Sequence, residues 1–169
     1  MKARGFSKNW EQGIPGQSPL VLYVEDNLEN QKVASLSLKK KYNVQIVSNA
    51  REACDFIRMT HESIDIILMD IELQESELNG IELTRLIRGN LKQPNLPGYA
   101  KDLPVLPGIP ILFVTAFSDK YSTAMLLAAG GQRVISKPVD FVELQLAMTQ
   151  IRLSAIKQSR IPPSLPEFQ

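Results

Sequence analysis

The sequence has little of the residues on which many kinds of site depend. Cys54 is the only cysteine and His61 the only histidine among the 169 residues. A single cysteine excludes a disulfide framework within the chain and a zinc site built from several cysteines. A single histidine excludes a histidine-rich metal site and argues against a Ser/His/Asp or Cys/His catalytic set.

The chain also lacks an excess of either charge and any long apolar run. Lys and Arg number 19 against 18 Asp and Glu, which leaves a formal net charge of +1. No global field therefore favours DNA, RNA or an anionic membrane. The apolar runs fall far short of the ~20 residues that span a bilayer, and residues 1–18 carry no apolar stretch of a signal peptide. We expect a cytoplasmic protein that binds neither membrane nor nucleic acid directly.

What the sequence does have is an alternation of short apolar runs and amphipathic segments. Continuous apolar runs are typical of parallel strands that are covered on both faces. Such runs stand at residues 20–24, 44–47, 64–69, 111–114 and 134–135. Helix-like segments follow at residues 27–41, 49–59, 80–91, 119–129 and from Asp140 onward. This order predicts an α/β protein with a flavodoxin-like (βα)5 doubly wound parallel sheet of strand order 2-1-3-4-5.

Three segments fall outside this alternation. Residues 1–18 are polar and predict a flexible N-terminal arm. Residues 158–169 contain three prolines and predict a C-terminal tail or linker, which leaves residues 19–157 as the domain. Residues 90–108 contain four prolines and are too long for an ordinary helix-to-strand connection. Because this insertion joins a helix to a strand, we expect it at the N-terminal edge of the sheet, away from a site at the opposite edge.

Polar side chains follow the predicted strands at their C-terminal ends. Glu25 and Asp26 follow the first strand, Asp70 the third, Thr115 the fourth and Lys137 the fifth. In a doubly wound sheet these ends line one crevice. Carboxylates that share a crevice repel one another and favour a bound cation, and oxygen ligands without His or Cys favour Mg²⁺. With a lysine and a hydroxyl beside them, the pattern predicts a phosphoryl-transfer site.

In this interpretation Asp70 is the nucleophile and forms an acyl phosphate. Asp26 and Asp70 hold the metal, Glu25 reaches it through water, and Lys137 and Thr115 bind the phosphoryl oxygens. Each residue alone has an ordinary explanation, since a carboxylate after a strand is usually a turn or cap residue and a lone lysine is usually solvated. The hypothesis rests on several strand ends that supply matching groups in one place.

These motifs resemble the response-regulator receiver domains of two-component signalling, and the first strand and helix are similar to receivers of hybrid sensor kinases. The resemblance covers roughly residues 19–157. The segments that carry it are Val24–Asn27, Asn30–Ala34, Leu68–Ile71, Gly80–Leu83, Arg85–Arg88, Val114–Ala116 and Ser136–Pro138. It implies a cis peptide bond between Lys137 and Pro138 and a metal ligand from the backbone carbonyl of Glu72.

The resemblance also implies a function in a phosphorelay. Asp70 would accept a phosphoryl group, with Mg²⁺, from a phosphohistidine on a histidine kinase or a histidine phosphotransfer protein. Phosphorylation would shift a two-state equilibrium. Thr115 would close on the phosphate and reshape the face of the fourth helix, fifth strand and fifth helix. That face would signal through protein–protein contacts or a homodimer. Such a phosphoprotein assists its own phosphorylation and dephosphorylation but is not a stand-alone enzyme.

Three features depart from the usual receiver pattern. Residues 71–79 lack the usual proline and Asp-Gly pair, are longer and contain three glutamates. We expect Glu72 to add a carboxylate near the metal or to repel the incoming phosphoryl group. Val134 stands where receivers usually have an aromatic switch residue, so we expect the coupling to the output face to be weakened or replaced. The insertion 90–108 is absent from typical receivers and is expected to be a partner surface or a family-specific addition.

Two other functions remain open. A receiver fold whose acidic loop no longer supports switching would be a phosphorylation-independent interaction module. The loop 71–79 and Val134 favour this function, whereas Thr115, Lys137 and the acidic pair oppose it. A Mg²⁺-dependent aspartate phosphatase of the haloacid-dehalogenase type also uses Asp, Thr and Lys. In that family the nucleophile comes first along the chain and the acidic ligands last, so the order found here disfavours it.

Overall fold

The computed structural model describes residues 18–116 and 120–159 and confirms the predicted α/β architecture. Five parallel strands form one sheet in the order β2-β1-β3-β4-β5. The strands are β1 (Leu20–Val24), β2 (Asn43–Val47), β3 (Ile64–Met69), β4 (Ile111–Thr115) and β5 (Arg133–Ser136). The helices are α1 (Leu28–Leu38), α2 (Ala50–Thr60), α3 (Gly80–Ile87), α4 (Thr123–Ala128), α5 (Phe141–Ser159) and the 3₁₀ helix η2 (Gly98–Ala100). The predicted arm up to residue 17 and the tail from residue 160 lie outside the described residues, so the domain boundaries stay predictions.

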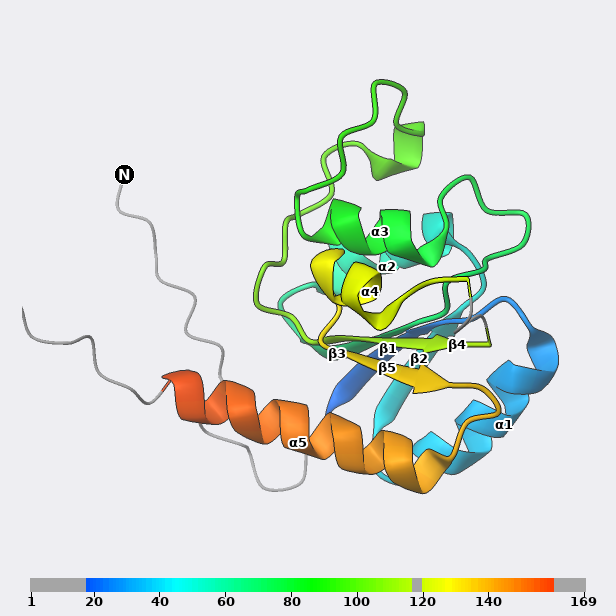
Figure 1. Cartoon of the computed structure of the whole chain (residues 1–169), viewed down its shortest axis with the longest axis vertical. Helices are drawn as coiled ribbons and strands as arrows, with labels where there is room; N and C mark the ends of the chain where they lie inside the picture. The colour runs from blue at the N-terminus through cyan, green and yellow to red at the C-terminus, as the bar shows by residue number, and fades with distance from the viewer. Residues whose placement is uncertain (1–17, 117–119, 160–169) are drawn as a thin grey trace, which may run out of the picture.

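Helices cover both faces of the sheet, with α2, α3 and α4 on one side and α1 and α5 on the other (Figure 1). Successive side chains along a strand point to opposite faces of the sheet and so contribute to two separate hydrophobic cores. In β1, Leu22 and Val24 pack toward α2 and α3, whereas Val21 and Tyr23 pack toward α1 and α5. Both faces of the central strands are therefore apolar, as the continuous apolar runs predicted. Within the described part of the chain, no helix has the length and apolar character that crossing a membrane requires.

Short polar side chains begin each of the five α-helices and fix where its strand-to-helix loop ends. The side-chain oxygen of each cap accepts hydrogen bonds from backbone N–H groups of the first turn, which have no partner within the helix. The caps are Asn27, Asn49, Asn79, Ser122 and Asp140. These loops carry the polar residues at the C-terminal ends of the strands, so the caps also fix the edge at which a site was predicted.

Three helices are shorter than predicted. Helix α1 was expected over residues 27–41 but spans Leu28–Leu38. Helix α3 was expected to reach Leu91 but ends at Ile87, because Gly89 adopts a left-handed conformation with φ of 73°. Helix α4 was expected over residues 119–129 but spans only Thr123–Ala128, since Ser122 caps its start; residue 119 lies outside the described residues. The predicted glycine stop is confirmed: the N–H of Gly131 bonds to the carbonyl of Leu126 and that of Gly130 to Leu127, a Schellman motif.

Arg88 joins three parts of the chain that are distant in sequence. Its guanidinium donates hydrogen bonds to the carbonyls of Leu106 (2.6 Å), Ile109 (2.7 Å) and Gly130 (2.8 Å). It thereby connects the end of α3 to the end of the insertion and to the turn after α4. Burial lowers its pKa, but a guanidinium remains charged at neutral pH. The insertion is therefore fixed at its C-terminal end by a half-buried cation.

Replacing Arg88 with Met is expected to lower the free energy of unfolding by about 2–3 kcal/mol, because it leaves three carbonyls without their charged donor. Urea unfolding followed by circular dichroism measures this change. Arg85→Met in the same helix is the matched control, since Arg85 makes no side-chain hydrogen bond among the described residues. Equal stability of the two variants would contradict the role of Arg88.

The only cysteine is predicted to be unreactive while the chain is folded. Cys54 lies in α2 with no exposed surface, and burial raises the pKa of its thiol to about 11. Because the thiolate is the reactive species, labelling by a disulfide reagent at pH 8 should proceed only as fast as the protein opens. Measured labelling rates should rise with urea in parallel with unfolding. Immediate labelling of the native protein would show that Cys54 is accessible.

Candidate functional site

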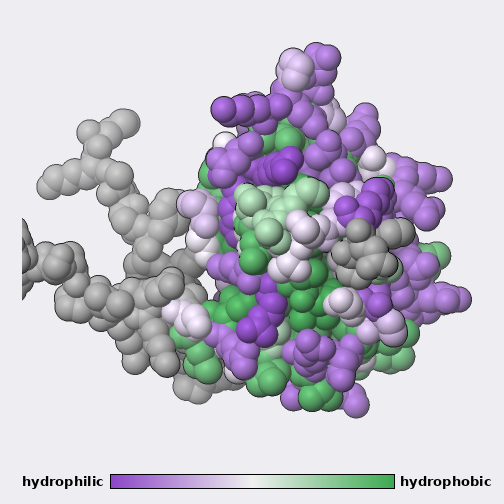
Figure 2. Space-filling view, in the orientation of Figure 1, coloured by the Kyte–Doolittle hydropathy of each residue, from purple (hydrophilic) through white to green (hydrophobic). Residues whose placement is uncertain are grey.

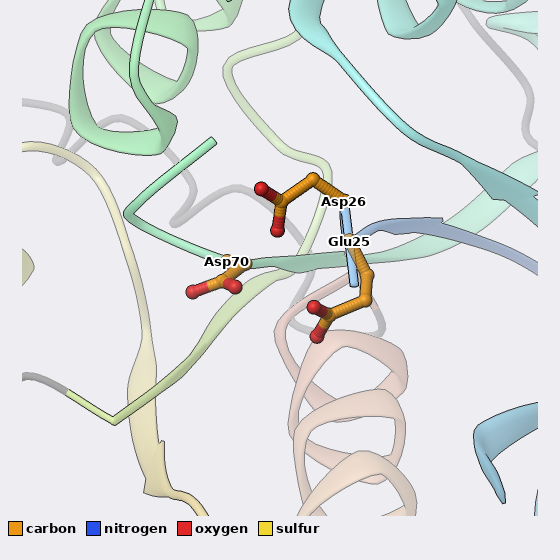
Figure 3. Close-up of side chains that lie close together, drawn as sticks. All are labelled: Glu25, Asp26 and Asp70. Carbon is orange, nitrogen blue, oxygen red and sulfur yellow. The ribbon is translucent and has the colours of Figure 1, made fainter. Parts of the chain in front are cut away.

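The predicted polar residues gather at the C-terminal edge of the sheet. Glu25 and Asp26 follow β1 and Asp70 follows β3, and each offers a carboxylate oxygen within 4.8 Å of the others (Figure 3). They line a crevice of about 250 Å³ together with Lys137 and with Ala116, the residue after Thr115. The loops after neighbouring parallel strands all leave the sheet at the same edge, which brings these residues together as the sequence analysis predicted.

Lys137 joins two of the carboxylates. Its ammonium nitrogen lies 2.6 Å from Oε2 of Glu25 and 2.7 Å from Oδ2 of Asp70. The peptide bond between Lys137 and Pro138 is cis, as the resemblance implied. The N–H of Lys137 also donates to the carbonyl of Thr115 (2.9 Å), which ties the end of β5 to the end of β4. The lysine therefore enters the crevice from a fixed backbone.

Glu25 is fully buried, and both oxygens of its carboxylate accept hydrogen bonds from the protein. Oε2 accepts from the hydroxyl of Tyr23 (2.9 Å), besides its contact with Lys137. Oε1 accepts from the N–H of Asn27 and the side chain of Asn30, each at 3.2 Å. In Figure 3 its side chain extends away from that of Asp26. Glu25 is thus held mainly as the partner of Lys137.

Tyr23 is a site residue that the sequence interpretation missed. Burial raises the pKa of its hydroxyl and the Glu25 carboxylate raises it further, so the group stays protonated and donates. The sequence contained a signal for this contact, because residues two apart in a strand point to the same face. Tyr23 in β1 and Glu25 directly after the strand stand at that spacing.

Asp70 is buried, with 5% of its surface exposed. Burial raises the pKa of its carboxyl to about 6 and the nearby Glu25 raises it too, although Lys137 and the N–H of Ile71 oppose the shift. That N–H donates to Oδ1 at 2.7 Å. Each oxygen of Asp70 therefore has one strong donor, and the group remains a carboxylate at neutral pH.

Asp26 is half-buried and is bonded to the loop between β3 and α3, residues 71–79, called here the β3–α3 loop. The N–H of Gln74 donates to Oδ2 of Asp26 at 2.8 Å. Residues 72–74 of this loop line one side of the crevice. The loop ends at Gly80, where an added Cβ would lie 1.8 Å from the carbonyl oxygen of Asp70. Only glycine allows this close return of the chain.

The side chain of Glu72 is bonded to Lys120 and Tyr121 rather than to groups of the three-carboxylate cluster. Its Oε1 lies 2.8 Å from Nζ of Lys120 and accepts from the hydroxyl of Tyr121 at 3.0 Å. The hydrogen bond from Lys120 lowers the pKa of Glu72. The sequence interpretation gave Glu72 the effect of an extra carboxylate or a repulsive charge, and the structure shows that Lys120 pairs with that charge. Neither Lys120 nor Tyr121 stood out in the sequence, since each is common in a surface loop.

Thr115 and Val134 lie in the strands beside the crevice. Thr115 ends β4, is fully buried and is followed by Ala116 at the mouth of the crevice. Val134 is half-buried in β5 and stands beside Phe113 of β4 in the sheet register. The structure thus brings Glu25, Asp26, Asp70 and Lys137 together and places Thr115 next to them.

Three carboxylates and one ammonium leave this edge of the sheet with an excess of negative charge. Carboxylate oxygens without nitrogen or sulfur donors are the ligands of hard divalent cations. Asp26 is the least buried of the three and opens into the crevice. The donor set therefore fits a Mg²⁺ ion better than a transition metal.

Replacing Asp70 with Asn is expected to raise the free energy of unfolding at pH 8, without divalent cations, by about 1–3 kcal/mol. A carboxyl whose pKa is raised on folding to about 6 destabilises the fold when it ionises, so this loss develops as the pH rises from about 4 to 6. The gain should therefore nearly vanish at pH 4.

Urea unfolding at both pH values in the presence of a chelator tests this expectation. Asp55→Asn, at an exposed position in α2, is the matched control and should show no comparable gain. A loss of stability in Asp70→Asn at pH 8 would mean that its ion pair with Lys137 outweighs the cost of burying the charge.

Comparison with known proteins agrees with the fold. The sequence model of the response regulator receiver domain matches residues 21–149. Hybrid signal transduction histidine kinase M of Dictyostelium discoideum is 32% identical over 125 residues, which are 73% of this chain and 5% of that protein. The autoinducer 2 sensor kinase/phosphatase LuxQ of Vibrio vulnificus is 33% identical over 130 residues, 76% of this chain and 13% of that protein. The chain thus spans a small part of the length of these curated relatives.

Comparison with solved structures also supports a receiver fold. The receiver domain of a sensor histidine kinase from Pseudomonas aeruginosa, crystallised with a magnesium ion in its active-site cleft, has 27% sequence identity and a TM-score of 0.61. The match covers 80% of this chain and 98% of that one. Because the family match extends over most of the chain and the fold agrees, this chain belongs to the response regulator receiver domains of two-component signalling.

Proposed function

We propose that the chain is a phosphoacceptor whose Asp70 receives a phosphoryl group from a phosphohistidine. The observation that carries this proposal is the buried Asp70 carboxylate, 2.7 Å from the ammonium of Lys137, at the crevice lined by Asp26. An oxygen of Asp70 attacks phosphorus, the bond from phosphorus to the donor imidazole breaks, and the products are an aspartyl phosphate and free histidine. Such a step needs positioning and charge stabilisation more than covalent chemistry from the protein.

The residues of the crevice have separate roles in this proposal. Lys137 already contacts Oδ2 of Asp70, so its ammonium stabilises charge on the phosphoryl oxygens without a large rearrangement. Thr115, at the neighbouring strand end, binds a phosphoryl oxygen with its hydroxyl. Glu25 holds Lys137 in place through the contact of 2.6 Å.

Asp26, Asp70 and the backbone carbonyl of Glu72 are proposed to hold Mg²⁺, with Glu25 contributing through water. The ion would neutralise negative charge that otherwise opposes the approach of a phosphoryl group. Two observations support this assignment: the oxygen-only donor set of the crevice and the magnesium ion in the related receiver from Pseudomonas aeruginosa. Because the N–H of Gln74 donates to Asp26, the β3–α3 loop keeps this carboxylate oriented before any cation binds.

The proposed partners follow from the relatives, whose names describe hybrid and sensor histidine kinases. The donor is a histidine kinase or a histidine phosphotransfer protein. The proposed output face comprises α4, β5 and α5, where Leu127, Val142 and Leu146 expose 45%, 79% and 57% of their surface. Figure 2 shows hydrophobic side chains at the surface over α4 and near α5. Apolar groups at such positions fit a protein–protein contact or a homodimer.

A phosphorylation-independent interaction module is the second candidate. The observation that favours it is Val134, which supplies no aromatic ring in β5 to follow a movement of Thr115. In that case the exposed face of α4, β5 and α5 would bind its partner in one state only. Neither candidate is a stand-alone enzyme, because an aspartyl phosphate that stays on Asp70 is a signal and not a released product.

Incubation with acetyl phosphate and Mg²⁺ is expected to add the mass of one phosphoryl group to the intact chain. The adduct should be absent from Asp70→Asn, absent when a chelator replaces Mg²⁺, and retained in Asp55→Asn. Mass spectrometry under acidic conditions, which preserve an acyl phosphate better than alkaline ones, measures it. If neither the phosphoryl group nor the stable mimic fluoroberyllate binds, the interaction module replaces the phosphoacceptor.

A further inference from the structure

The ammonium of Lys137 has more N–H groups than it has carboxylate partners. An ammonium offers three N–H donors, and Lys137 has two acceptors among the described residues. Its Nζ lies 2.6 Å from Oε2 of Glu25 and 2.7 Å from Oδ2 of Asp70. Lys137 lines the crevice, and its side chain is 13% exposed. Its remaining N–H can therefore serve an acceptor that enters the crevice.

The share of the ammonium that Glu25 takes depends on the donors around its carboxylate. A carboxylate oxygen has two acceptor sites. On Oε2 of Glu25, Lys137 takes one site and the hydroxyl of Tyr23 takes the other at 2.9 Å. Oε1 accepts from the N–H of Asn27 and from the side chain of Asn30. Because both oxygens have donors besides Lys137, the carboxylate is held in one orientation, with Oε2 toward the lysine.

The hydroxyl of Tyr23 occupies a fixed position beside Glu25. The side chain of Tyr23 is 2% exposed and packs in the core between the sheet and helices α1 and α5. Its backbone belongs to β1, which pairs with β2 on one side and β3 on the other. Glu25 has no exposed surface, so an acceptor site on Oε2 without a donor would be costly. Removal of the hydroxyl therefore favours a closer approach of Lys137 to Glu25.

We propose that Tyr23 is a positioning residue for phosphoryl transfer to Asp70 and acts through Glu25 and Lys137. Its hydroxyl holds Oε2 so that Glu25 takes one N–H of Lys137 and leaves another for an oxygen of the phosphoryl group. Without the hydroxyl, the Glu25 carboxylate turns and draws the ammonium away from Asp70. The lysine is then less able to stabilise charge on the transferred group. The effect on phosphorylation rests on the proposed function, whereas the arrangement of Lys137 does not.

The test compares Tyr23→Phe with the matched control Tyr42→Phe. Tyr42 is 8% exposed and belongs to the same core as Tyr23. The hydroxyl of Tyr42 makes no hydrogen bond among the described residues, so its loss leaves Glu25 unchanged. Each variant removes one phenolic hydroxyl from one core, and only Tyr23→Phe removes a donor to Glu25.

The first measurement is the crystal structure of both variants and of the wild type, without phosphodonor or divalent cation. In Tyr23→Phe, the distance from Nζ of Lys137 to Asp70 should lengthen beyond hydrogen-bonding range, while the contact with Glu25 is kept. In wild type and Tyr42→Phe, both contacts should remain. If Lys137 still bridges Glu25 and Asp70 in Tyr23→Phe, the proposal is overturned, whether or not the chain is phosphorylated.

The second measurement is the initial rate of phosphorylation by acetyl phosphate, followed by mass spectrometry. At saturating Mg²⁺ the rate should be about tenfold lower in Tyr23→Phe than in wild type and Tyr42→Phe, a smaller loss than outright removal of a preorganised donor causes. The Mg²⁺ concentration that gives half the maximal rate should not rise, because neither Asp26 nor Asp70 accepts a hydrogen bond from Tyr23. A general loss of site structure would raise it.

The outcomes separate this inference from the proposed function. An unchanged rate in Tyr23→Phe, or a lower rate together with a higher Mg²⁺ requirement, would overturn the positioning role of Tyr23. If no chain is phosphorylated, wild type included, the proposed function fails. The crystal structures still decide in that case whether Tyr23 controls the arrangement of Lys137.

Discussion

The ammonium of Lys137 lies between the carboxylates of Glu25 and Asp70, and the arrangement of the crevice depends on this contact. Two buried carboxylates without a cation would be strongly destabilising, because removing charge from water is costly unless it is paired. One lysine offsets part of this cost and leaves Asp26 with its charge directed into the crevice. The hydrogen bonds that Glu25 accepts from Tyr23, Asn27 and Asn30 hold its carboxylate in place beside Lys137. The site is therefore arranged in advance for a cation and an anion that arrive together.

The sequence alone predicted the sheet and the polar edge because both depend on local patterns. Continuous apolar runs identified the strands, and strand β3 was predicted with the bounds that the structure has. The side chains after β1, β3 and β5 were brought together by the strand order, which follows from alternating strands and helices. These features need no knowledge of how individual side chains pack.

Features that depend on contacts between distant segments were not predictable in this way. The carboxylate of Glu72 is paired with Lys120, which lies 48 positions away, and no local sequence pattern relates the two residues. The course of the insertion depends on Tyr99, whose contacts with Arg51 and Arg58 of α2 form only in the folded chain. The end of α3 was overestimated because Leu91 follows Ile87 at helical spacing, whereas Gly89 between them adopts a left-handed conformation that ends the helix.

Arg88 constrains one end of α4, a helix of the proposed output face. It holds the carbonyl of Gly130 directly after α4, so the C-terminal end of this six-residue helix is tied to α3. The other end of α4 follows Tyr121, whose hydroxyl donates to Glu72 at 3.0 Å and whose ring packs against the core on the side of α2 and α3. With its C-terminal end tied to α3, α4 would move more near Ser122 than near Gly130 if it were displaced. Binding partners that distinguish two states of this chain would therefore read the first turn of α4 rather than its last.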